Sequence, residues 1–409
     1  MNWFPFFVLS LAKRRLLIPA IALKPIASVI VLLGCTALAQ AAISPQPESP
    51  AGHRAVVQHS LAPQTPYFSA NQPNKLAAAQ GAMTACTTRT LSQAGYCEVV
   101  ELDGVAITSA RTIKDAADAK QHPLMLWTFR HNDTTVYLAG SVHALKAGFF
   151  PLPVQFEEAF AKSDHLVVEV DTAKYSPNVI QQKVLQYSLL CPETLPTPCA
   201  KTLSSVVPEP QYGRLQAAAS DYGISLQSLQ AFKPNFVAQQ LTNLALTAIG
   251  YDANLGLESY FTQQRGDRPI LELETIEQQL TLLFDQPIAT QLAMLEETLQ
   301  QFNDYESIQR DLMSAWYNGD NATFNRLIKE SAGDTPAAQA FMRKIVDDRN
   351  RTMAAKIAEL LSSEAKPNDS KDSYFVLAGA AHMVGVTGIP TLLQQQGYAG
   401  RRVFSKDTL

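Results

Sequence analysis

The sequence lacks the short motifs of several enzyme classes. Its 409 residues include 5 cysteines and 7 histidines, and no C-x-x-C, H-E-x-x-H or G-x-S-x-G pattern occurs. A thioredoxin-like centre, a zinc ribbon, a zincin-type protease and a serine hydrolase with a nucleophile elbow are therefore not indicated. No basic run follows the first segment and the net charge is −4, so we expect no nucleic-acid partner.

Acidic residues are absent from the first 41 residues, and the apolar stretch PIASVIVLLGCTALAQAA ends in small residues. This pattern predicts an export signal over residues 1–41, cleaved after Ala39 or Ala41. A weak lipoprotein box ends at Cys35, and an uncleaved membrane anchor is the alternative. We expect the body of the protein to be exported, either periplasmic or attached through the N-terminus to the inner or outer membrane. The basic residues of this segment are Lys13, Arg14, Arg15 and Lys24.

Apolar periodicity is also missing from residues 42–84, which are rich in Pro, Ala and Gln. Such a composition predicts a disordered linker, and leaves residues 85–409 as the folded domain. Cys86 and Cys97 bracket one short loop, and Cys191 and Cys199 bracket another. In an oxidising compartment these spacings predict two disulfides.

Strand and helix patterns alternate along the folded part. Two β-type runs at residues 124–129 and 135–140 flank turn-forming residues, which predicts a hairpin. Residues 165–171 and 373–379 predict further strands, and residues about 203–357 are mostly helical in pattern. We therefore predict an α/β fold whose first and last strands pair in one sheet, with a helical insertion between them.

Two G-x-x-H motifs follow apolar LAG runs at the ends of predicted strands, one at Gly140–His143 and the other at Gly379–His382. Open α/β sheets bind ligands at the carboxyl ends of their strands, and glycine lets the backbone turn there. Each histidine alone is more typical of a loop residue that satisfies backbone groups, but the pair favours a site.

A third group for this site is Glu169, which lies in the apolar strand HLVVEVD. An unpaired carboxylate there would cost several kcal/mol of desolvation. A divalent cation (Mn, Co or Zn) bound by His143, Glu169 and His382 would compensate that charge and leave positions open for water. A salt bridge to an arginine is the alternative, with Asp171 as a competing carboxylate.

Other polar residues are candidates for catalysis. Glu272 and Glu274 alternate with leucines in a predicted strand, so both would face one side, and one could be a general base. Arg349 and Asn350 lie in a predicted helix, where a guanidinium could contact an oxyanion. Glu258 is a further candidate, although the ordinary role of a glutamate on a helix is a solvent-facing charge.

At these motifs the sequence resembles the TraB/GumN/Tiki family, over roughly residues 126–404. The stretch from Val136 to Asp171 is similar to the first block of the family, and GLESYFTQQRGDRPILELETIEQQL to its middle block. RNRTMAAKIAELL and FVLAGAAHMVGVTGIPTLLQQQGY are similar to its last. The resemblance implies an α/β fold with two related halves and a metal-dependent hydrolytic site.

Tiki proteins of this family are metalloproteases that use the two G-x-x-H histidines and a glutamate, which correspond here to His143, His382 and Glu169. Glu274, Arg349 and Asn350 match further family positions. The family usually has Asp where this chain has Glu258. We therefore expect a hydrolase that cleaves an amide bond in a peptide or protein substrate by metal-activated water. The alternative is a non-catalytic module that binds a peptide or signal outside the cytoplasm.

Overall fold

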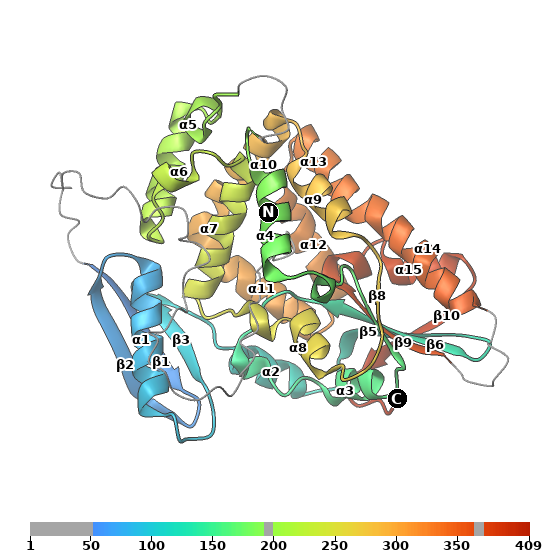
Figure 1. Cartoon of the computed structure of the whole chain (residues 1–409). Helices are drawn as coiled ribbons and strands as arrows, with labels where there is room; N and C mark the ends of the chain where they lie inside the picture. Colours follow the sequence, from blue (N-terminus) through green and yellow to red (C-terminus); the bar gives the residue numbers. More distant parts are fainter. Residues whose placement is uncertain (1–51, 192–198, 364–371) are drawn as a thin grey trace, which may run out of the picture.

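The computed structural model describes residues 52–191, 199–363 and 372–409 (Figure 1). The predicted export signal or anchor at residues 1–41, and the first ten residues of the predicted linker, lie outside this part of the chain. Within the described ranges, no helix is long and apolar enough to cross a bilayer.

A six-stranded mixed sheet in the order β10-β5-β6-β9-β7-β8 forms the core. The predicted hairpin is confirmed: β5 (Pro123–His131) pairs antiparallel with β6 (Thr134–Ser141). Asn132 has φ 50° in the two-residue turn, as the twist of a tight hairpin favours. On its other side β6 pairs parallel with β9 (Ser373–Gly379), so the first and last parts of the chain meet as predicted.

The remaining strands extend the sheet to both edges. β7 (His165–Val168) runs parallel to β9, and β8 (Ile270–Glu272) runs parallel to β7. β10 (Ala399–Phe404) pairs antiparallel with β5. The central strands β6 and β9 are buried almost throughout, which explains their continuous apolar runs. The predicted α/β class is confirmed.

Helices surround this sheet and make up most of the chain between Leu203 and Ser362 (Figure 1). The bounds of these helices are α2 (Ala110–Asp118), α3 (Val154–Ala161), α4 (Pro177–Ser188), α5 (Leu203–Val206), α6 (Glu209–Asp221), α7 (Pro234–Ala248), α8 (Leu257–Gln264), α9 (Ile276–Phe284), α10 (Ile288–Gln301), α11 (Tyr305–Tyr317), α12 (Asn321–Ala332), α13 (Pro336–Met342), α14 (Arg349–Ser362) and α15 (Ile389–Gln395). A π-helical segment, Arg343–Asp348, leads directly into α14.

The linker was predicted over residues 42–84, and a second sheet corrects this prediction for its described part, residues 52–84. It has the order β2-β1-β3-β4, built from β1 (His53–His59), β2 (Ala62–Gln72), β3 (Cys97–Leu102) and β4 (Val105–Ala106). The helix α1 (Lys75–Arg89) packs on it through small buried residues such as Ala78 and Ala82. The composition misled because Pro63 and Pro66 lie in β2, at the edge of the sheet, where strands tolerate prolines.

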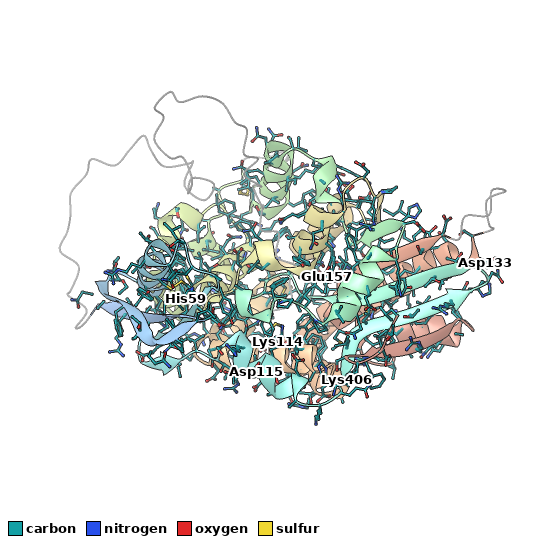
Figure 2. All side chains as sticks on the ribbon, turned by 90° about the horizontal axis from the view of Figure 1, so that it is seen from below. His59, Lys114, Asp115, Asp133, Glu157 and Lys406 are labelled. Carbon is teal, nitrogen blue, oxygen red and sulfur yellow. A yellow bond between two sulfur atoms is a disulfide. The ribbon has the colours of Figure 1, made fainter. Side chains whose placement is uncertain are left out.

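Both predicted disulfides are confirmed. Cys86 of α1 bonds to Cys97 at the start of β3, with their Cα atoms 6.2 Å apart, and Cys191 bonds to Cys199. Seen from below, Figure 2 places His59 of the second sheet and Asp133 of the β5–β6 turn at opposite ends of the molecule. The second sheet therefore flanks the six-stranded core at the end away from that hairpin turn.

Candidate functional site

The pairing of β6 with β9 brings the two G-x-x-H motifs together. Ser141 pairs with Gly379 in the parallel register, so the two loops leave the same edge of the sheet. A Cβ atom on Gly379 would lie 3.3 Å from Glu169 Oε1, 3.5 Å from His382 Cδ2 and 3.7 Å from His143 Nε2. The three predicted ligands therefore converge on the space that this glycine leaves open.

His382 is buried and held by a side-chain amide. Its Nδ1 lies 2.6 Å from Asn350 Oδ1, while Asn350 Nδ2 donates to the carbonyl oxygen of Thr387 at 2.8 Å. The amide oxygen can only accept, so Nδ1 carries the proton and Nε2 presents a lone pair. Burial and the positive charge of Arg349 lower the pKa of His382 to about 3. The imidazole is therefore neutral near pH 7, and its Nε2 faces Glu169 Oε1 at 3.7 Å.

His143 is held by a carboxylate instead. Its Nδ1 lies 3.4 Å from Glu258 Oε2, and Ser141 Oγ donates to Glu258 Oε1. Burial alone would lower the pKa of His143, but the charge and hydrogen bond of Glu258 raise it above its usual value. With 26% of its side chain exposed, His143 is the more accessible of the two imidazoles.

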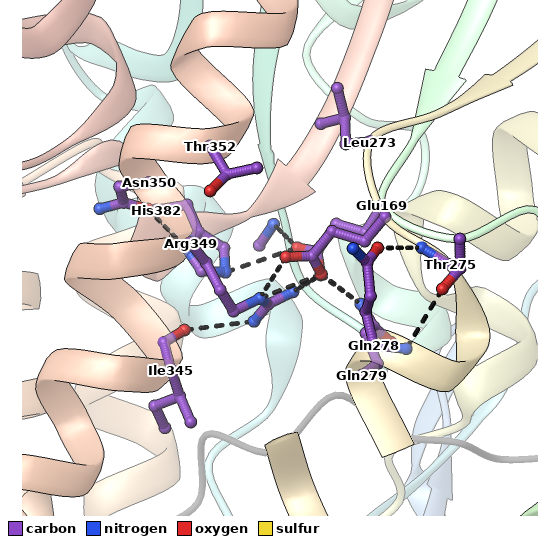
Figure 3. A network of polar contacts seen from close by, with 12 residues as sticks. Glu169, Leu273, Thr275, Gln278, Gln279, Ile345, Arg349, Asn350, Thr352 and His382 are labelled. Atoms are coloured by element: carbon purple, nitrogen blue, oxygen red, sulfur yellow. Dashed lines mark hydrogen bonds and ion pairs between the residues drawn. The ribbon is translucent and has the colours of Figure 1, made fainter. Parts of the chain in front are cut away.

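Glu169 lies one residue beyond β7, and its carboxylate is neutralised by an arginine. Arg349 Nη2 lies 2.5 Å from Glu169 Oε2, and Gln279 Nε2 donates to the same oxygen at 3.0 Å (Figure 3). Oε1 accepts the backbone N–H of Gly379 at 2.7 Å. Burial alone would raise the pKa of Glu169, but the charge of Arg349, followed by those of the histidines, lowers it to about 2. The salt bridge to an arginine, which was the alternative to a metal ion, is therefore present.

Glu274 belongs to the same buried network. Its backbone N–H donates to the carbonyl oxygen of Glu169, which places the two carboxylates side by side at the strand ends. Arg349 donates to Glu274 through Nε at 2.9 and 3.0 Å and through Nη2 at 2.8 Å. Arg349 Nη1 donates to Ile345 at 3.2 Å. Each guanidinium nitrogen therefore has a partner within the protein.

The structure separates Glu272 from this site, contrary to the expectation that it shares one face with Glu274. The strand β8 ends at Glu272, whose side chain forms an ion pair with Lys174 at 3.0 Å. Because the chain turns into α9 after β8, the two-residue alternation does not extend to Glu274, which is buried.

The sequence left Glu258 open between a candidate role and a solvent-facing charge, and the structure buries its Oε2 beside His143. Sequence reasoning missed one residue of the site, Gln279. Gln279 bridges Glu169 and Glu274, and its Nε2 lies 3.3 Å from Glu274 Oε2. A signal existed for Gln279: it lies at helical spacing on the stripe formed by Ile276, Leu280 and Leu283, where a polar residue needs an explanation.

As they stand, the described residues contain no group of three His, Cys, Asp or Glu side chains arranged to hold a metal ion. The donors nevertheless fit a divalent cation in part. The Nδ1 atom of His382 is hydrogen-bonded to an acceptor, and that of His143 lies at ion-pair distance from Glu258, which is the usual orientation of histidine ligands. The space above Gly379 lies between them. Of the Glu169 oxygens, Oε1 faces this space, and Oε2 is committed to Arg349 and Gln279.

The charges of the buried network do not balance. Glu169 and Glu274 carry two negative charges, Arg349 carries one positive charge, and all three are nearly excluded from water. His382 is neutral, and the remaining charges beside these three groups are those of His143, whose pKa is raised, and of Glu258. A buried net charge is unfavourable unless a counter-charge compensates it, and a protonated His143 or a bound cation would each supply a positive charge.

Comparison with known proteins identifies the family of this chain. The chain belongs to the TraB/PrgY/gumN family, which matches residues 125–402. It is also similar to an uncharacterized protein of Treponema pallidum (strain Nichols), at 21% identity over 279 residues that cover 66% of this chain and 80% of the relative. No solved structure matches the chain.

Proposed function

We propose that the protein is an exported, metal-dependent hydrolase that cleaves an amide bond in a peptide or protein substrate. The observation that carries the proposal is the convergence of His143 Nε2, Glu169 Oε1 and the ring edge of His382 on the space beside Gly379. The two carboxylates that share Arg349 would be further stabilised by a positive charge, which a bound cation or a protonated His143 would supply. The two disulfides support export, because such bonds persist in oxidising compartments.

In this proposal His143 and His382 hold a divalent metal (Mn, Co or Zn) through their Nε2 atoms, and Glu169 faces it through Oε1. When bound, such a metal polarises a carbonyl group and lowers the pKa of a water molecule. Asn350 keeps the lone pair of His382 directed at the centre, and Glu258 does the same for His143.

The contacts of Arg349 change the roles proposed for it and for Glu274. Arg349 was expected to contact an oxyanion and Glu274 to accept a proton. Since Arg349 bridges Glu169 and Glu274, its role in this arrangement is to hold both carboxylates in place. For Glu274 to accept a proton, Arg349 would first have to release one of its oxygens.

A digest of a peptide library with the full-length protein tests the proposal. We expect cleavage that stops on addition of a chelator and returns when Mn, Co or Zn is restored. His143→Ala and His382→Ala should each abolish cleavage, whereas His131→Ala, an exposed histidine that packs edge-on against Tyr398, should cleave as well as wild type. Full cleavage by either site variant would contradict the proposal.

One observation favours the alternative of a non-catalytic peptide-binding module: the carboxylate of Glu169 is already neutralised by Arg349. The buried glutamate therefore does not by itself require a metal. The two functions are separated by metal analysis of the purified protein and by peptide binding measured without metal. A metal-free chain that binds peptide and never cleaves it would establish the binding module.

A further inference from the structure

The second sheet precedes the segment that matches the family, and it contacts the loop that carries His143. That loop continues from His143 into Lys146, whose side chain is 2% exposed and among the largest fully buried ones of the described residues. A buried ammonium group needs hydrogen-bond and charge partners. The hydrogen-bond acceptor of Lys146, Thr108, and its ion-pair partner, Glu98, both lie before residue 125.

The ammonium group of Lys146 joins three parts of the molecule. Nζ donates to the carbonyl oxygen of Thr108 at 2.8 Å and lies 3.6 Å from Glu98 Oε1. It also lies 5.1 Å from the ring centre of Tyr251, a cation–π distance. Glu98, on β3, is buried and also accepts the backbone N–H of Ala110 at 2.8 Å. A single buried carboxylate thus holds both the start of α2 and the loop of His143.

Two further contacts make this connection close. A Cβ atom on Gly148 would lie 2.7 Å from Tyr96 Oη, beside the start of β3, and 3.0 Å from Ala110 Cβ in α2, so a larger residue would require these groups to shift. The backbone N–H of Thr108 donates to Glu306 of α11 at 2.9 Å. Thr108, which accepts the hydrogen bond of Lys146, is therefore also held by Glu306 of α11.

The opposite side of the His143 loop rests on the segment that leads into α8. Leu145 and Asp252 exchange two backbone hydrogen bonds of 3.1 and 2.9 Å, and Leu257 N–H donates to Val142 at 3.0 Å. A Cβ atom on Gly256 would lie 2.3 Å from the carbonyl oxygen of His143. The loop is therefore clamped between the α8 segment, which carries Glu258, and the second sheet, which carries Glu98.

We propose that the second sheet is a positioning element for His143, acting through the buried contact between Lys146 and Glu98. In this view the sheet and its Cys86–Cys97 disulfide belong to the functional unit, although they lie outside the segment that defines the family. A role of this contact in catalysis rests on the proposed hydrolase site. The contact between Lys146 and Glu98 can be tested without measuring hydrolysis.

The test measures the reactivity of His143 in the full-length protein. Lys146→Met removes the ammonium group at similar side-chain length, and Glu98→Gln keeps an oxygen for Ala110 while removing the charge. Each variant is treated with diethyl pyrocarbonate, and the modification rate of His143 is followed by peptide mass spectrometry, with ring signals followed by NMR. We expect a several-fold change in the rate and shifted His143 ring signals in both variants.

Lys233→Met is the matched control, since Lys233 also donates to main-chain carbonyls, those of Tyr187 at 2.7 Å and Phe284 at 3.0 Å. It should lower stability and leave the His143 signals unchanged. Wild-type rates and signals for His143 in the folded Lys146→Met or Glu98→Gln protein would overturn the inference.

If neither variant folds, hydrogen exchange of the wild-type protein tests whether the His143 loop and the second sheet are coupled. The amides of residues 142–146 and of β3 should then lose protection together, as parts of one cooperative unit. Exchange of the loop while β3 stays protected would overturn the inference. None of these readouts depends on hydrolysis, so failure of the proposed function would be seen separately.

Discussion

At the scale of the residue, Gly379 is the most informative position. Its φ of −50° and ψ of 140° suit alanine, so Gly379→Ala introduces no backbone strain. The added methyl group would occupy the space between His143, His382 and Glu169. We expect hydrolysis and metal affinity to fall by about tenfold or more, measured by peptide cleavage and by metal titration.

Gly213→Ala is the control for this substitution. Gly213 lies in α6 with nothing within 4 Å of the added methyl group, so that variant should gain about 0.5–1 kcal/mol of stability and keep its activity. Wild-type activity in Gly379→Ala would show that the open space is not used.

Arg349 is the second residue whose replacement gives a clear expectation. Arg349→Met leaves Glu169 and Glu274 buried without their shared cation. We expect a loss of about 3–5 kcal/mol in the free energy of unfolding, as when one partner of a buried pair is removed, measured by urea denaturation.

Arg326→Met provides the comparison, because the Arg326–Glu330 pair is exposed on α12. Its removal should cost at most about 1 kcal/mol. Equal losses in the two variants would mean that the Arg349 network is not a buried one.

The sequence predicted the central residues of the site because strand-end motifs are local patterns. His143, His382 and Glu169 each follow an apolar strand, and parallel strands bring such positions to one edge of the sheet. Gln279 was not predicted, and Glu258 was left open, because both lie on helices, where burial depends on which face meets the rest of the protein. The Arg349 bridge joins residues 180 apart, which no local pattern specifies.

At the scale of the element, the strands of the six-stranded sheet were predictable because their apolar runs are long. The second sheet was not. Its edge strand β2 carries prolines and exposed polar residues, and its helix α1 buries alanines, which give little periodic signal. Composition therefore predicted a linker where strand pairing and close helix packing form a folded unit.

The Cys86–Cys97 disulfide should contribute to the stability of this unit. It joins α1 to β3 across a sequence separation of 11, and we expect the paired change Cys86→Ala and Cys97→Ala to cost roughly 2–3 kcal/mol. Differential scanning calorimetry of the oxidised wild type and the variant measures this difference. An unchanged melting temperature would contradict it.

At the scale of the whole molecule, the buried network makes stability depend on pH. The pKa of Glu169 is lowered from 4.5 to about 2, so its contribution is complete above pH 4.5 and is lost as the pH falls through 2. The pKa of His382 is lowered from 6.5 to about 3, so protonation opposes folding progressively below pH 6.5. Protonation of either Glu169 or His382 therefore lowers the free energy of unfolding.

We therefore expect the free energy of unfolding to fall by a few kcal/mol between pH 7 and pH 3.5. Urea denaturation at a series of pH values measures it. His382→Gln should flatten the part of this decline that lies between pH 6.5 and 4.5, where Glu169 is still ionised. An equally steep decline in that variant would assign the acid sensitivity to other groups.

The central claim is that His143 and His382 act together on one bound cation. Its most direct test is the metal content of the purified full-length protein, determined by mass spectrometry after dialysis against Mn, Co or Zn, beside that of the His143→Ala/His382→Ala double variant. The account predicts a single tightly bound ion per wild-type chain and none in the variant. Equal metal content in both proteins, or peptide cleavage by a wild-type chain that holds no metal, would contradict it.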